Sequence, residues 1–320
     1  MAGTNWRNQT AITEVILLGF RDLPSLQTPL FLLFLVIYTV TMAGNILIVF
    51  VVVADQHLHT PMYFFIGNLS CLETCYTSTI LPRMLASLVT GNRTISIKNC
   101  IGQNYLFASL TGSECYLLSL MSYDRYVAIC KPLHYSMLMN NRSCLFLATG
   151  CWISGFFASS ITTILISQLS FCGPNQIDHF VCDIFPLIEL SCKDTRIVDI
   201  ITFTLAGIFT LPPFLLTLMS YILIISTILR IPSTTGKHKA FSTCSSHLIV
   251  VTLFYGTLIF VYILPKSKAQ SNLTKVFSLS YTALTPMVNP LIYSLRNKMV
   301  KEALGNFVGK LFLYSGIQRK

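Results

Sequence analysis

Two carboxylates lie within long apolar stretches of the sequence, where an ionised side chain is costly. Glu73 and Glu114 each interrupt a run of mostly apolar residues. An acid in such surroundings must be paired with a cation, or must be protonated and hydrogen-bonded, because the isolated charge loses its hydration. The two glutamates therefore predict either a cation site or a pair of neutral carboxyl groups, and the residues alone leave both open.

An aspartate and an arginine are adjacent at the end of another apolar run. Asp124 and Arg125 can form a simple interfacial ion pair, with the long arginine side chain reaching the polar boundary. The usual catalytic signatures are absent from the sequence: it has no nucleophile elbow, no zinc-binding His-Glu-x-x-His, no P-loop and no Gly-rich dinucleotide turn. We therefore expect no catalytic residues and no enzyme activity.

Four of the 11 cysteines lie in polar connectors, whereas the others lie in or beside apolar runs and are typical of small buried hydrophobes. Cys100, Cys172, Cys182 and Cys192 are expected to share the extracellular side, where disulfides persist. Four cysteines allow three pairings, and the residues do not choose among them. His179 near Cys182 is a candidate metal ligand, although a lone loop histidine is more typical of polar surface.

The composition requires a lipid environment. Of 320 residues, 53% are hydrophobic and only 11% are charged, and the mean hydropathy is +0.66, whereas soluble domains carry about 25% charged residues. The net charge of +10 does not indicate nucleic-acid binding, because the basic residues lie in short connectors and form no continuous stripe. We expect an all-α membrane protein in contact with lipids.

Seven apolar runs are long enough to cross the hydrocarbon core, which needs about 20 residues per helix. Polar residues within these runs must face a protein interior. We predict a single domain over 1–320, a seven-transmembrane helix bundle with spans at about 28–53, 59–81, 99–129, 143–168, 197–229, 239–263 and 273–294.

The orientation follows from weak signals. Lys and Arg are slightly in excess on the side of the C-terminus, which favours a cytoplasmic C-terminus. The glycosylation sequon at Asn8 suits an external N-terminus, whereas those at Asn92 and Asn272 lie close to the membrane and are left open. We predict an extracellular segment 1–27, a cytoplasmic tail 295–320 and a multi-pass plasma-membrane location.

The connectors have different predicted roles. The longest, Ser170 to Arg196, is expected to cover the extracellular end of the bundle. Residues 296–310 repeat apolar side chains at helical spacing opposite a basic face, which predicts a short amphipathic helix on the inner leaflet. Internal repeats with paired broken helices are not visible, which argues modestly against a carrier, although buried acids are also compatible with a channel.

Several motifs together resemble a known family. Tyr123-Asp124-Arg125-Tyr126 and Asn289-Pro290-Leu291-Ile292-Tyr293 are similar to the signatures of rhodopsin-like G-protein-coupled receptors. The blocks Leu58–Phe65, Met121–Tyr135 and Lys239–Leu248 resemble the hallmark blocks of vertebrate olfactory receptors. The resemblance covers nearly the whole chain, with mild departures at Ser122, where the family commonly has Ala, and at Glu73, where it often has Asp.

The resemblance implies a two-state switch. Arg125 is expected to be restrained by Asp124 at rest and to meet a heterotrimeric G protein of the stimulatory, olfactory type on activation, which raises cyclic AMP. It also implies Na⁺ as the cation at Glu73 and Glu114, with no other cofactor, and the disulfides Cys100–Cys182 and Cys172–Cys192. The implied switch residues are Asp124, Arg125, Tyr126, Tyr221, Asn289, Pro290 and Tyr293.

The resemblance also implies a ligand cavity in the outer half of the bundle. On the third span the candidates recur at three or four residues and share one face. None of the candidates is charged, and the aspartate with which amine receptors hold an ammonium is replaced by Phe107. We expect a small, mostly neutral hydrophobic odorant. The candidate contacts are Asn104, Phe107, Ala108, Thr111, Gly112, Leu205, Phe209, Tyr255, Leu258, Tyr262, Leu279 and Thr282.

Overall fold

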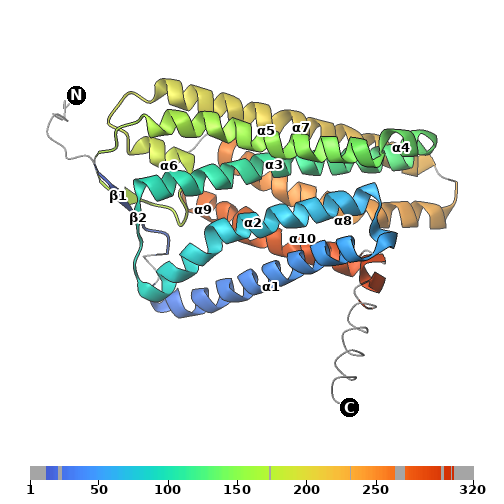
Figure 1. The fold of residues 1–320 in the computed structure, drawn as a ribbon, viewed down its shortest axis with the longest axis horizontal. Helices are drawn as coiled ribbons and strands as arrows, with labels where there is room; N and C mark the ends of the chain where they lie inside the picture. The colour runs from blue at the N-terminus through green and yellow to red at the C-terminus, as the bar shows by residue number, and fades with distance from the viewer. Residues whose placement is uncertain are drawn as a thin grey trace, which may run out of the picture.

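The computed structural model describes residues 12–20, 24–172, 174–230, 232–263, 271–296, 299–303 and 305. Long helices run side by side along one axis, as Figure 1 shows. The sequon at Asn8 lies outside the described residues. The predicted inner-leaflet helix at 296–310 lies mostly outside them and stays a prediction.

Within the described residues, the long helices form seven passes through the bundle, with two short α-helices between them. The short helices are α4 (Pro132–Leu138) and α6 (Ile184–Glu189). The sixth and seventh passes each contain a π-helical turn, η4 and η6. The passes are α1 (Gln27–Ala54), α2 (Pro61–Thr90), α3 (Ile97–Cys130), α5 (Asn141–Ser167), α7 (Arg196–Arg230), α8 (Thr234–Leu258) with η4 (Ile259–Ile263), and α9 (Ser271–Leu279) with η6 (Ser280–Leu284) and α10 (Thr285–Arg296).

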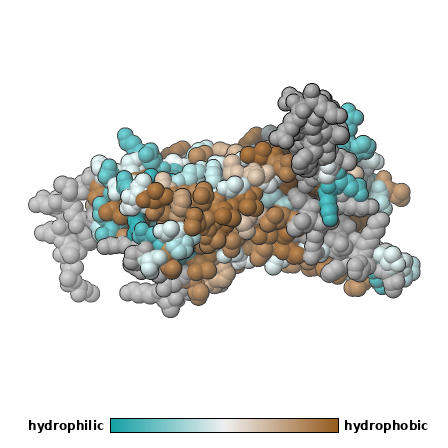
Figure 2. Space-filling view, turned by 90° about the horizontal axis from the view of Figure 1, so that it is seen from below, coloured by the Kyte–Doolittle hydropathy of each residue, from teal (hydrophilic) through white to brown (hydrophobic). Residues whose placement is uncertain are grey.

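The outside of the bundle is apolar at mid-height. By length and hydropathy alone, α1, α5 and α7 qualify as membrane spans among the described residues. The remaining passes contain more polar side chains, and Glu73 on α2 and Glu114 on α3 are buried within the bundle. Figure 2 shows hydrophobic side chains over the middle of one face and hydrophilic ones towards its two ends. This surface fits a seven-transmembrane bundle in lipid.

Helix α2 is longer than the predicted span of 59–81. It passes through Pro82 and continues to Thr90, where Gly91 ends it with a φ of +71°, a conformation that glycine adopts without strain. The extension is stabilised because Leu85 and Leu88 are buried in the core. A proline removes one backbone hydrogen bond, and here the packing beyond it maintains the helix.

A small sheet lies at the end of the bundle that bears the long connector, and the sequence did not predict it. Strand β1 (Glu14–Leu17) is central, with β2 (Thr94–Ser96) antiparallel on one side and β3 (Gln176–Ile177) parallel on the other. Val15 and Leu17 point into a buried cluster. The strands are too short for a clear alternation pattern, and β1 is held in place by contacts with two distant connectors.

Helices α3 and α5 approach each other most closely at a glycine. A Cβ built on Gly155 would meet the carbonyl oxygen of Ser109 and would lie 2.6 Å from the backbone nitrogen of Ser113. The Ser113 hydroxyl also donates to the carbonyl of Trp152 at 3.3 Å. Only a residue without a side chain allows this backbone contact.

We predict that Gly155→Ala destabilises the protein by about 1–3 kcal/mol, because backbone atoms that cannot rotate away would clash with the new methyl group. Gly150→Ala on the same helix is the control, since a Cβ there meets nothing within 4 Å. The control variant should be up to about 1 kcal/mol more stable than the parent, because alanine has a higher helix propensity than glycine. Melting temperatures of the two purified variants test this, and equal values would contradict the close approach.

Candidate functional site

A cavity of about 130 Å³ lies among α3, α5, α7, the α8–η4 pass and the connector that precedes α6. Its wall is mostly apolar. A preformed, mainly apolar cavity with a few polar groups is typical of small-molecule sites. The predicted contacts that line it are Asn104, Phe107, Ala108, Thr111, Gly112, Leu205, Phe209, Leu258 and Tyr262.

The other three predicted contacts, Tyr255, Leu279 and Thr282, do not line this cavity. The Tyr255 hydroxyl is fully buried and donates to the carbonyl of Cys115 at 2.6 Å. The Thr282 hydroxyl donates to the carbonyl of Ser278 at 2.7 Å. Leu279 packs against the hydrophobic core. The two hydroxyl groups hold the helix backbone and its neighbours together, and so they are not available to this cavity.

The sequence reasoning missed the whole wall that α5 contributes. Gly155, Ala158, Ser159 and Thr162 line the cavity. Their spacing of three or four residues puts them on one helix face, and this run of small residues was a signal in the sequence. The other cavity-lining residues that were not predicted are Cys115, Asp183, Ile184, Phe185, Thr202, Ala206 and Thr210.

The expectation of a wall without charge was wrong at one position, because Asp183 lines the cavity. Its Oδ1 accepts from the backbone N–H of Ile184 at 2.7 Å, which caps α6. Both carboxylate oxygens lie 3.3 Å from the Tyr262 hydroxyl, which in turn is 2.8 Å from that of Tyr281. Asp183 therefore ties the connector to the sixth and seventh passes. Its position follows from the disulfide at the preceding residue.

Both predicted disulfides are confirmed. Cys100 at the start of α3 is bonded to Cys182, with 5.3 Å between the Cα atoms. Cys172 is bonded to Cys192, with 5.7 Å between the Cα atoms, and closes the connector on itself. These distances are normal for disulfides.

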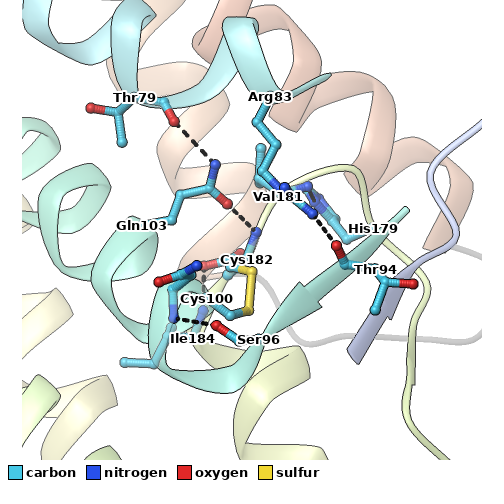
Figure 3. Close-up of a disulfide and its surroundings, with 12 residues drawn as sticks. Thr79, Arg83, Thr94, Ser96, Cys100, Gln103, His179, Val181, Cys182 and Ile184 are labelled. Atoms are coloured by element: carbon cyan, nitrogen blue, oxygen red, sulfur yellow. Dashed lines mark hydrogen bonds between the residues drawn. A yellow bond between two sulfur atoms is a disulfide. The ribbon is translucent and has the colours of Figure 1, made fainter. Parts of the chain in front are cut away.

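Hydrogen bonds around the first disulfide fix the connector to α3, α3 to α2, and α2 to β2 (Figure 3). The Gln103 amide donates to the carbonyl of Thr79 on α2 at 3.1 Å and accepts from the backbone N–H of Cys182 at 3.2 Å. Arg83 donates to the carbonyl of Thr94 on β2 at 2.5 Å. The outer end of the cavity is therefore covered by a well-anchored segment.

His179 is buried, whereas a position on the polar surface was expected. Its Nδ1 accepts from the backbone N–H of Val181 at 3.2 Å. Its ring stacks on Phe180, with 4.5 Å between the centroids. These contacts give the ring a packing role in the connector.

The middle of the bundle holds the two acids. Glu73 accepts a hydrogen bond from the Asn289 side chain, and Asn45 lies close to the same carboxyl group. The two glutamates are near enough for their charges to interact. Four buried oxygen atoms here have no hydrogen-bond partner within the part of the chain that the structure describes: Asn45 Oδ1, Glu73 Oε2, Glu114 Oε1 and Asn289 Oδ1. Oxygen ligands of this kind fit a hard cation.

The inner end of α3 holds an ion pair. Arg125 Nη2 lies 2.6 Å from Asp124 Oδ2, and the Tyr135 hydroxyl on α4 donates to Asp124 Oδ1 at 2.9 Å. Burial, and then the nearby carboxylate, raise the pKa of Tyr135 well above its usual value. The phenol therefore remains a donor at neutral pH.

Two of the other predicted switch residues, Tyr126 and Tyr221, lie beside this inner end. Tyr221 on α7 is 2.6 Å from Nδ1 of His247 on α8, a partner that sequence reasoning missed. Tyr126 packs against the cluster that contains Tyr221. Pro290 packs closely against Gly44, where a Cβ would lie 3.0 Å from the proline ring. The side chain of Tyr293 lies outside the described residues.

We predict that Tyr255→Phe lowers the free energy of unfolding by about 1 kcal/mol, because the Cys115 carbonyl loses its buried donor. Tyr255→Leu should cost more, about 3 kcal/mol, since it also removes the packed ring. Thermal denaturation of the purified variants is the measurement. A Tyr255→Phe protein as stable as the parent would show that the hydrogen bond contributes nothing.

Comparison with known proteins agrees with this arrangement. A family model described as olfactory receptor matches residues 34–310. The chain is 52% identical to human olfactory receptor 10A7, over 93% of this chain and 94% of that protein. It is 46% identical to human olfactory receptor 6C3, over 96% and 99%, and 46% identical to mouse olfactory receptor 5AP2, over 94% and 95%. The chain therefore belongs to the olfactory receptor family, whose members are odorant receptors and not enzymes.

Proposed function

We propose that this odorant receptor binds a small, mostly neutral hydrophobic molecule in the cavity and then activates a stimulatory, olfactory-type G protein, which raises cyclic AMP. The observation that carries the proposal is the layout of α3. The same helix contributes Phe107 and Thr111 to the cavity and holds the Asp124–Arg125 ion pair at its inner end. A ligand can thus bias the packing of the helix that bears the switch.

The chemistry of the wall supports a neutral ligand. Phe107, Leu205, Phe209 and Leu258 make most contacts apolar, so that burial of a hydrophobic molecule is favourable. A carboxylic acid would be repelled by the Asp183 carboxylate. That carboxylate already accepts hydrogen bonds from a backbone N–H and from a tyrosine.

The switch requires a difference in affinity between two states. A ligand shifts the equilibrium only as far as it binds the active packing better than the resting packing. Release of Arg125 must break its ion pair with Asp124, which Tyr135 also holds. The Tyr221–His247 contact joins α7 to α8 beside this pair and is a second contact that rearrangement would change.

We assign the N-terminal strand to the extracellular side of the plasma membrane. It pairs with the connector that carries both disulfides, and disulfides persist in oxidising surroundings. The Asp124–Arg125 end of α3 then faces the cytoplasm, where a G protein is available.

We further propose that Glu73 and Glu114 hold Na⁺ together with the side-chain oxygens of Asn45 and Asn289. One Na⁺ would balance the charge of one of the two carboxylates, and a proton on the other carboxyl group would neutralise the second. The support is the set of partnerless buried oxygens around them. The alternative is a pair of protonated carboxyl groups within the bundle, which would need no ion.

The main proposal predicts that Arg125→Ala abolishes the cyclic AMP response to neutral volatile ligands in cells that display the receptor at the surface. The reason is that the group that meets the G protein is removed. Arg196→Ala is the control, because Arg196 is exposed and pairs with the neighbouring Asp194 on the extracellular side. A surface-expressed Arg125→Ala receptor that signals fully would refute the role, and a ligand-gated current without cyclic AMP would indicate a channel.

The ion proposal predicts that sodium lowers agonist potency in the parent receptor and that Glu73→Gln removes this dependence, because a neutral amide no longer balances the ion. Glu189→Gln, at the exposed end of α6, should retain it. Concentration–response curves with sodium replaced by a large organic cation provide the measurement. Identical sodium dependence in the parent and in Glu73→Gln, or none in either, would favour the protonated pair.

A further inference from the structure

Two polar side chains at the cavity are buried and find no hydrogen-bond partner in the described part of the chain. Asn104 on α3 is 1% exposed and Thr202 on α7 is 5% exposed, and both line the cavity. Among the described residues, neither Nδ2 nor Oδ1 of Asn104 has a partner, and the hydroxyl of Thr202 has none. Buried polar groups are nearly always hydrogen-bonded, so that these atoms need an explanation.

Three other hydroxyl groups on the cavity wall, those of Thr111, Thr162 and Tyr262, have hydrogen-bond partners within the protein. Thr111 donates to the carbonyl of Phe107 at 2.9 Å, and Thr162 donates to the carbonyl of Ser159 at 3.0 Å. Tyr262 is bonded to Asp183. Helical threonines commonly bond back to their own helix in this way. The missing partners are therefore a property of Asn104 and Thr202 and not of every polar residue at the cavity.

We propose that Asn104 and Thr202 form a subsite for a hydroxyl group, so that the preferred ligands are small alcohols and phenols. This inference rests on the cavity being the odorant site. An amide needs both a donor and an acceptor, and a hydroxyl group supplies both from one atom. An aldehyde, ketone or ether can only accept, and it leaves Asn104 Oδ1 unpaired. A hydrocarbon satisfies neither residue.

The volume of the cavity and the charge of Asp183 further restrict the class of ligand. A cavity of about 130 Å³ is similar to the roughly 150 Å³ that admits benzene in an engineered protein core. Asp183 disfavours carboxylic acids by like-charge repulsion. It would attract an amine, but its oxygens already accept hydrogen bonds from Ile184 and Tyr262, whereas Asn104 and Thr202 are neutral and are unpaired with respect to every described residue. A neutral hydroxyl group fits the unpaired atoms better than a cation.

Two matched ligand sets test the inference. The first is benzyl alcohol, benzaldehyde, toluene and benzylamine, and the second is the set of cyclohexyl analogues. Binding is measured as a rise in the melting temperature of the purified receptor, and signalling as cyclic AMP in cells. We expect each alcohol to act at about tenfold lower concentration than its aldehyde, and the hydrocarbon to be weakest.

Three variants assign the effect to residues. Asn104→Leu should remove the preference for alcohol over aldehyde, and Thr202→Val should weaken alcohol binding by about tenfold. Thr252→Val is the control, since Thr252 is exposed on α8 and bonded to its own helix. The Thr252→Val receptor should prefer the alcohol over the aldehyde to the same extent as the parent receptor does.

The outcomes of these experiments distinguish the hydroxyl subsite from the proposed odorant-receptor function. The inference would be overturned if the aldehyde, hydrocarbon or amine bound and signalled at the same concentration as the alcohol or at a lower one. An unchanged preference for alcohol over aldehyde in Asn104→Leu would also overturn it. No rise in melting temperature with any member of either set would also overturn it, even if other odorants still raised cyclic AMP. Stabilisation by alcohols without any cyclic AMP would support the subsite and contradict the proposed coupling.

Discussion

The bundle depends on satisfying polar groups away from water. Lipid offers no hydrogen bonds, so polar side chains at mid-depth are costly unless they turn inwards, where protein groups or a bound ligand or ion can pair with them. Glu73 of α2 accepts a hydrogen bond from Asn289 of α10. Asn45 of α1 donates to the carbonyl of Pro286, which also belongs to α10. These contacts join the first, second and seventh passes around one polar centre. They fix which faces of these helices point inwards, while the apolar faces remain in contact with lipid.

Helix α3 connects this centre to both ends of the receptor. Its outer end is attached to the connector by Cys100, its middle contributes Asn104 and Glu114, and its inner end carries Arg125. Its close contact with α5 at Gly155 leaves little freedom between these two helices. Protein interiors are densely packed and respond to a ligand by discrete repacking rather than by smooth deformation. A change at the cavity can thus reach the ion pair.

The extracellular cover is built by segments that are distant in the sequence. Strand β1 pairs with both β2 and β3, and the two disulfides hold the connector against α3 and against itself. Lys275 on α9 adds an ion pair with Asp178 at 2.5 Å. This cover places Asp183 beside the cavity, in contact with Tyr262. The cavity is therefore completed by a loop whose position depends on covalent and hydrogen-bonded anchors.

The sequence by itself determined the number of spanning helices, the burial of Glu73 and Glu114, and, through the family resemblance, the disulfide pairing. Successive side chains point about 100° apart around a helix. In a span that is apolar on every side, no polar face marks the outside, so the sequence does not reveal which face turns inwards. The small residues at helical spacing on α5 were visible in the sequence, but only the tertiary structure could place them and Asp183 at the cavity and direct Tyr255 to a backbone carbonyl. The pairing of β1 was likewise decided by distant contacts, since four residues have too little local preference to form a strand alone.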